Sequence, residues 1–144
     1  MSFLNTVNET FYSLIDKFEF KATKVNENFV LLNSDRCIIS IKQHFGEVDV
    51  RLRKLDGVTE IRPLLWAYIF KKLDYTKIIS PKFSPDTNLG TIVKYHLILE
   101  CSYIRLFCNE LLHGDFSKEK IYLRESENVL KKINQFWEES NIPK

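Results

Sequence analysis

Residues 36–53 alternate between apolar and polar side chains in two short runs, and this alternation constrains the fold more than any other feature of the sequence. The alternating apolar residues are Cys37, Ile39 and Ile41 in the first run and Val48, Val50 and Leu52 in the second. A period of two places successive side chains on opposite faces of a strand. Gly46, between the runs, can adopt the positive φ that a tight hairpin turn commonly needs. The stretch therefore predicts an antiparallel hairpin with one face in a core and the other toward water or a partner.

The segments on either side of this hairpin predict a single α+β domain, residues 1–144. Apolar residues at spacings of three and four predict helices, and short apolar or alternating runs between turn residues predict strands. The expected order is an N-terminal helix over 3–18, a four-stranded antiparallel meander over about 21–54, and helices over 59–73, 91–113 and 118–139. A helix, then strands, then helices is typical of α+β proteins, and we expect the last three helices to pack on one face of the sheet.

Several residues mark where the helices begin and end. Ser2 or Asn5 can cap the first helix, Pro63 suits the first turn of the second, and Gly114 can end the third in the left-handed conformation. The third helix is apolar over most of its circumference, which predicts a buried spine. Residues 74–90 are predicted to form the longest loop, which either has a function or carries the chain across the sheet.

The net charge of +2 is unevenly distributed along the chain. Residues 51–94 contain nine Lys or Arg and four Asp or Glu, whereas residues 1–50 contain five and seven. A solvated surface explains such an excess. A nucleic-acid-binding domain usually has a pI above about 9, whereas the pI of this sequence is 8.4, so nucleic acid is not the expected partner.

Cysteine usage and hydropathy predict a cytoplasmic protein. The three Cys have no CxxC spacing and suit a reducing compartment. The first residues lack the basic and apolar regions of a signal peptide. No stretch of eighteen residues is free of charge, so no transmembrane helix is expected.

The residue types that perform catalysis form no recognisable motif. His96 and His113 lie about 25 Å apart along one predicted helix, and His44 lies in the hairpin turn, so we expect three unrelated histidines. Cys101 and Cys108 lack the further ligands of a zinc site and are expected to be buried small side chains. The sequence therefore predicts no enzyme activity, no metal and no cofactor.

The charged face of the second strand has more than one interpretation. Glu47 and Asp49 are spaced so that they can bind a divalent ion, but Arg51 and Arg53 continue the same face, and ion pairing on a wetted sheet explains all four. The face is also suited to specific protein recognition, because it carries both signs of charge. We predict a partner-binding surface that comprises Lys42, Glu47, Asp49, Arg51 and Arg53.

Two short motifs accompany this order of elements. One is Gly46-Glu47-Val48-Asp49-Val50 in the hairpin, and the other is Leu112-His113-Gly114-Asp115-Phe116 at the end of the longest helix. Together they resemble small bacterial immunity-type proteins encoded beside polymorphic or contact-dependent toxins. The resemblance implies a non-catalytic protein that neutralises a cognate protein toxin by covering its active site. It leaves the toxin class open, because the sequence lacks the acidic, aromatic-rich surface expected of an inhibitor of a basic nuclease.

The first hypothesis is therefore a protein-binding module, an immunity protein that occludes a toxin. The second is a small nucleic-acid-binding domain that uses the basic middle third, namely Arg51, Arg53, Lys54, Arg62, Lys71 and Lys72. The third is a small hydrolase with His44 as its base.

Overall fold

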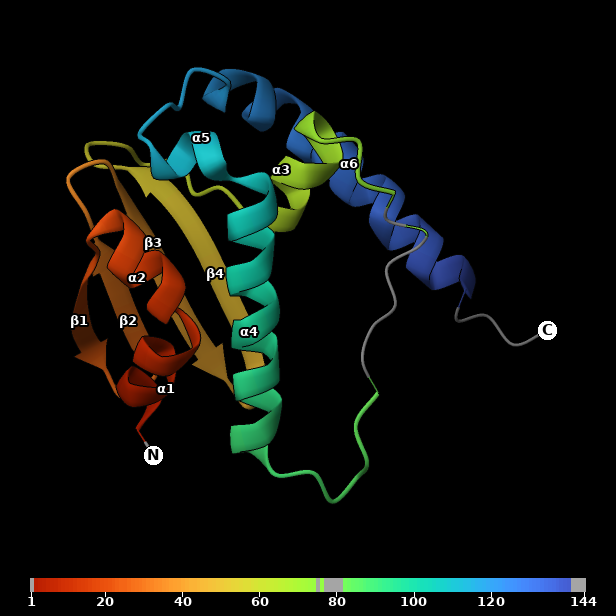
Figure 1. Ribbon diagram of the computed structural model, residues 1–144. Coiled ribbons are helices and arrows are strands. Elements are labelled where there is room, and N and C mark those ends of the chain that lie inside the picture. The colour runs from red at the N-terminus through yellow and green to blue at the C-terminus, as the bar shows by residue number, and fades with distance from the viewer. Residues whose placement is uncertain (1, 75, 77–81, 141–144) are drawn as a thin grey trace.

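The computed structural model describes residues 2–74, 76 and 82–140, and it confirms the α+β fold (Figure 1). The N-terminal helical segment comprises α1 (Phe3–Thr10) and α2 (Tyr12–Phe18). The strands are β1 (Lys21–Asn26), β2 (Phe29–Asn33), β3 (Cys37–His44) and β4 (Glu47–Lys54). The remaining helices are α3 (Pro63–Phe70), α4 (Leu89–Phe107), α5 (Asn109–Leu112) and α6 (Glu119–Ser140).

The sheet is the predicted antiparallel meander, with the strands in sequence order β1-β2-β3-β4. Its register aligns the alternating apolar residues across the strands, so that Ile41 lies opposite both Val30 and Val50, and Ile39 lies opposite Leu52. These side chains are almost fully buried. Because a shift of one residue would turn all of them to water, the burial of this face fixes the register.

The helices cover one face of the sheet (Figure 1). The helices α1, α2 and α4 lie across that face, and α3 and α6 pack against each other beyond α4. The buried residues of helices and strands form one hydrophobic cluster, with Phe11, Leu14 and Leu97 facing the strand residues of the core. The expected helix signals are present, since Ser2 accepts a hydrogen bond from the Asn5 N–H and Pro63 occupies the first turn of α3.

Two predicted helices are interrupted. The helix expected over 3–18 is broken at Phe11, and the one expected over 91–113 is broken at Cys108. Both residues leave the helical conformation, with φ of −98° and −116°, and both side chains are fully buried. At each break the chain changes direction and an apolar side chain remains buried in the core. Burial of that side chain therefore outweighs the helical hydrogen bonds that are lost.

The other predicted features are partly confirmed. Gly114 has the expected positive φ of 84°. The helix α4 is buried on one side only, and Leu106 on its other side is 69% exposed. Residues 75 and 77–81 of the predicted loop 74–90 lie outside the described residues, and in its described remainder Phe83 packs against Tyr95 and His96 of α4. None of the described helices is long and apolar enough to cross a membrane.

Candidate functional site

The side of the sheet away from the helices carries the predicted partner-binding residues. We call this side the open face, and it comprises Lys42, Glu47, Asp49, Arg51 and Arg53 together with Phe29, Leu31 and Ile38. Their neighbours in sequence on β3 and β4 are the buried core residues, so alternation places these side chains on the opposite face. The structure therefore brings all five predicted residues onto one surface.

The strand register arranges the open face in rows. One row runs from Phe29 through Lys42 to Asp49, and Lys42 Nζ lies 4.6 Å from the centre of the Phe29 ring. The next row runs from Leu31 through Ser40 to Arg51. Charged side chains therefore concentrate on β4, whereas partly buried apolar side chains concentrate on β2. Apolar and charged side chains therefore adjoin each other on this face.

The ion pairs of this face hold β4 charges to one another and to the following loop. Arg51 Nε lies 3.0 Å from Asp49 Oδ1, and Arg51 Nη1 lies 2.8 Å from Glu60 Oε2. Arg53 Nη1 donates a 3.4 Å hydrogen bond to the Gly57 carbonyl. The ion-pairing interpretation is therefore correct for Asp49 and Arg51, whereas Arg53 contacts a main-chain carbonyl.

The open face has a depression near the turn of the β3–β4 hairpin. The depression of about 480 Å³ is lined by Asn26, Asn28, Phe29, Lys42, His44, Glu47 and Asp49, among others. Three of the five predicted residues thus surround one concavity, with carboxylates on β4 and the Lys42 ammonium on β3. A protruding polar or charged side chain of a partner can enter such a hollow.

The tip of the β3–β4 hairpin carries a functional candidate that the sequence analysis missed. Phe45 is 81% exposed and has a φ of +48°, and Gly46 after it has a φ of +89°. Both turn residues are therefore left-handed, which suits Asn-Gly far better than Phe-Gly. The centre of the Phe45 ring lies 4.4 Å from that of the His44 ring. An exposed aromatic residue in a conformation that costs energy motivates the hypothesis that Phe45 contacts a partner, and the Phe-Gly pair in the turn was the signal for it.

Phe45→Asn is expected to stabilise the protein by about 0.5–1 kcal/mol, because asparagine tolerates the left-handed conformation better than phenylalanine. Little apolar burial is lost, since the ring is exposed. Urea unfolding of the variant and the parent chain measures the difference. A loss of stability would show instead that the contact with His44 contributes more than the turn strain costs.

The three histidines lie in separate environments. His44 contacts Phe45, His96 contacts Phe83 and Tyr95, and the His113 ring lies 5.3 Å from that of Phe18. All three cysteines are buried and free, as expected. Burial raises the pKa of the Cys37 thiol to about 11. Within the described residues, no group of three or more His, Cys, Asp or Glu side chains is arranged to hold a metal ion.

The basic residues of the middle third do not converge on one surface. Arg51 and Arg53 lie on the open face, whereas Arg62 directly precedes α3 and Lys71 directly follows it. Several are paired with carboxylates, since Lys71 lies 3.1 Å from Glu110 and Lys54 lies 3.9 Å from Glu119.

Comparisons with protein-family models, with curated protein sequences and with solved structures find no significant match for this chain.

Proposed function

We propose that this protein is a non-catalytic protein-binding module that neutralises a cognate protein toxin, and that the open face is the surface that binds it. The observation that carries the proposal is the placement of Lys42, Glu47, Asp49, Arg51 and Arg53 on one side of a sheet whose other side is sealed by helices. A rigid, pre-formed surface loses little conformational entropy on binding.

The composition of the open face supports a protein partner. Apolar side chains on β2 and β3 adjoin charges of both signs on β4, and the exposed Phe45 extends from the hairpin at the same end of the sheet as the depression. Phenylalanine is enriched in protein interfaces, and arginine is enriched among the residues that contribute most to binding energy. The mixed charges add orientation and speed of association.

The same arrangement favours a protein over a nucleic acid. A uniformly negative backbone is bound by clusters of unpaired Lys and Arg. On the open face, Arg51 already contacts two carboxylates and Lys42 lies opposite Asp49. A partner with a basic group for Asp49 and Glu47 and an acidic group for Lys42 and Arg53 complements this surface better.

Reversing two charges with the double variant Asp49→Lys/Arg51→Glu is expected to weaken toxin binding by at least about tenfold. Both changes are on the surface, so the cost in stability is expected to be below about 1 kcal/mol. The test co-expresses the chain with the toxin encoded next to its gene and measures cell growth and the dissociation constant of the purified pair.

Reversal of the exposed Glu127–Lys131 pair is a matched control. These residues form an ion pair of 3.4 Å on α6, on the helical side of the molecule and away from the open face. The control variant is expected to bind and protect as the parent chain does. Equal binding by both double variants would reject the open face, and a lack of protection by the parent chain itself would reject the neutralising function.

A further inference from the structure

The free edge of β4 exposes main-chain groups that no neighbouring strand covers. Leu52 and Ile61 exchange two hydrogen bonds, of 2.8 and 2.7 Å, on the side of β4 away from β3. In an antiparallel ladder every second residue points its N–H and C=O to the same side. Val50 and Val48 therefore point theirs in the same direction as Leu52, and among the described residues no hydrogen bond to these four groups is formed.

The edge stays open because the chain turns away after one pair. Pro63, which has no N–H, begins α3 two residues after Ile61. The Arg62 N–H donates instead to the Tyr122 hydroxyl of α6, at 3.0 Å. The segment that pairs with Leu52 thus continues as a helix and leaves a gap beside Val48 and Val50.

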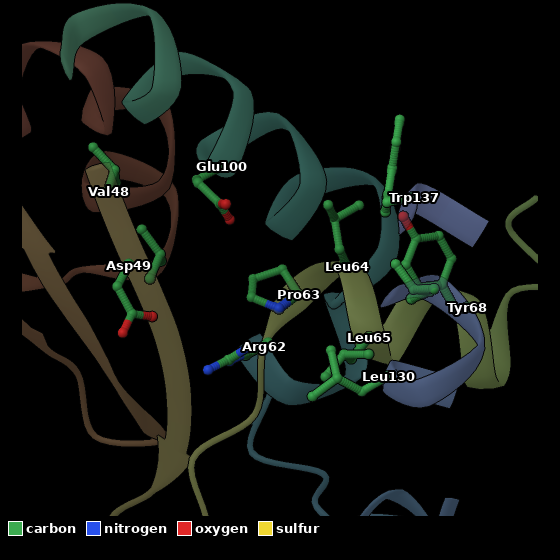
Figure 2. A pocket seen from close by; sticks show the side chains of 12 residues that line it. Val48, Asp49, Arg62, Pro63, Leu64, Leu65, Tyr68, Glu100, Leu130 and Trp137 are labelled. Carbon is green, nitrogen blue, oxygen red and sulfur yellow. The ribbon is translucent and has the colours of Figure 1, made fainter. Parts of the chain in front are cut away.

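This gap is a groove of about 440 Å³ between β4, α3, α4 and α6 (Figure 2). Its walls are mostly apolar, and they include Val48, Val50, Pro63, Leu65, Leu130 and Trp137. Figure 2 shows the Glu100 carboxylate extending from α4 into the space between β4 and α3, with the Arg62 side chain directed toward β4 from below. Asp49 lines the groove from β4.

The Glu100 carboxyl is a desolvated titratable group inside this groove, and a cation beside it would favour its ionised form. Desolvation by burial, and secondarily the charge of Asp49, raises the pKa of Glu100 to about 8. Within the described residues Glu100 has no ion pair shorter than 4 Å, although Arg62 lines the same groove. The other titratable groups around it are Tyr68 on α3, Tyr103 on α4 and the buried Cys108 at the end of α4, whereas α6 contributes apolar side chains.

We infer that this groove binds an extended peptide segment of a partner protein, which pairs as a fifth strand with Val48 and Val50 and places a lysine or arginine beside Glu100. Only an extended backbone offers alternating donors and acceptors at the spacing of the exposed groups on β4. The residue opposite Val48 or Val50 points its side chain toward α4, because directly paired residues share a face. A cation at that position meets Glu100, and apolar residues two positions away meet the groove walls.

This site lies at the edge of β4 beside the open face, and Val48 and Asp49 line both the groove and the depression of that face. The probe is an end-capped heptapeptide of alternating threonine and valine whose central valine is replaced by lysine, so that valine, lysine and valine share one face. NMR titration of the labelled protein is expected to shift the backbone amides of Val48 and Val50. A peptide with glutamate at the centre is expected to bind at least about tenfold more weakly than the lysine peptide. The Glu100→Gln variant is expected to lose most of this preference for lysine over glutamate.

Val48→Pro is the decisive variant. It removes the edge N–H without touching the β3–β4 ladder, and proline is tolerated on edge strands, so binding is expected to be lost while the thermal unfolding stays cooperative. Val25→Pro, at the bulge of the opposite edge strand β1, is the control and is expected to bind normally. If Val48→Pro does not fold, the same peptide N-methylated at its valines and lysine gives the equivalent test.

Three outcomes would overturn the inference. Equal binding of the N-methylated and unmodified peptides would exclude strand pairing. A lack of shifts at Val48 and Val50 at millimolar peptide would exclude the site altogether. A concentration-dependent dimer with protected Val48 and Val50 amides would assign the edge to a second copy of the chain. None of these outcomes bears on the open face, so the proposed function is tested separately.

Discussion

At about pH 9 the Glu100→Gln variant is expected to be more stable than the parent chain by roughly 1–3 kcal/mol, whereas at about pH 4 the two are expected to be equally stable. The pKa of Glu100 is raised from 4.5 to about 8 in the folded protein, by burial and by Asp49. Below pH 4.5 the carboxyl is protonated in both states. Between 4.5 and about 8 the unfolded chain releases the proton and the folded chain keeps it, so rising pH favours unfolding. Glutamine does not ionise, so the variant does not lose this part of its stability as the pH rises.

Urea unfolding at several pH values from 4 to 9 measures the effect. The Glu47→Gln variant is the matched control, because it makes the same chemical change at an exposed position of the hairpin. Its difference from the parent chain is expected to stay within about 0.5 kcal/mol. A Glu100→Gln variant whose stability tracks that of the parent chain across the whole range would mean that water solvates the carboxyl, and that the groove does not desolvate a charge.

The sheet could be predicted from the sequence because its signals are local. The period-two alternation of residues 37–53, the glycine in the turn and the polar residues between the strands each constrain a few neighbouring positions, and the register follows from which face is buried. The same alternation identified the five charged residues of the open face. Their function remains a proposal, because the identity of a partner is not a local property of the chain.

The groove could not be predicted, because it depends on residues that are distant in sequence. It exists because Ile61 pairs with Leu52 for one residue only and because α3, α4 and α6 enclose the space beyond. One signal was nevertheless present in the sequence. Glu100 lies three residues after Leu97 and four before Ile104, which places a carboxylate on the apolar stripe of a helix that is otherwise buried on that side.

The breaks at Phe11 and Cys108 and the exposure of Leu106 are all places where tertiary packing overrides a helical pattern. The spacing of apolar residues predicts which side of a helix is buried, but not how much apolar surface the rest of the protein offers to cover it. The sheet face covered by α4 accommodates only Val93, Leu97, Cys101 and Ile104 of that helix, so the remaining apolar residues of its circumference stay partly in water. Tertiary geometry thus limits what a helical pattern can predict.

Trp66→Ala is expected to destabilise the protein by roughly 3–5 kcal/mol, the largest loss among the changes considered. The side chain is fully buried on α3, its ring centre lies 4.3 Å from that of Phe70, and it is 6.1 Å from that of Tyr122 on α6. Its indole N–H donates a 2.8 Å hydrogen bond to Glu110 on α5. The truncation therefore leaves a cavity between three helices and an acceptor without its donor, and it removes the support of the α3 wall of the groove.

Trp66→Phe combined with Glu110→Ala separates the hydrogen bond from the packing. Burial alone raises the pKa of Glu110, but its own backbone N–H, Trp66 and Lys71 outweigh burial and lower it. The carboxylate is therefore ionised and its hydrogen bonds are charge-assisted, so a double-mutant cycle is expected to give a coupling energy of about 1–2 kcal/mol. Trp137→Ala, on the partly buried side of α6, is the control and is expected to cost about half as much as Trp66→Ala. A loss below about 1 kcal/mol for Trp66→Ala would mean that α3 is held in place without this residue, and that the groove wall depends on the Arg62–Tyr122 contact instead.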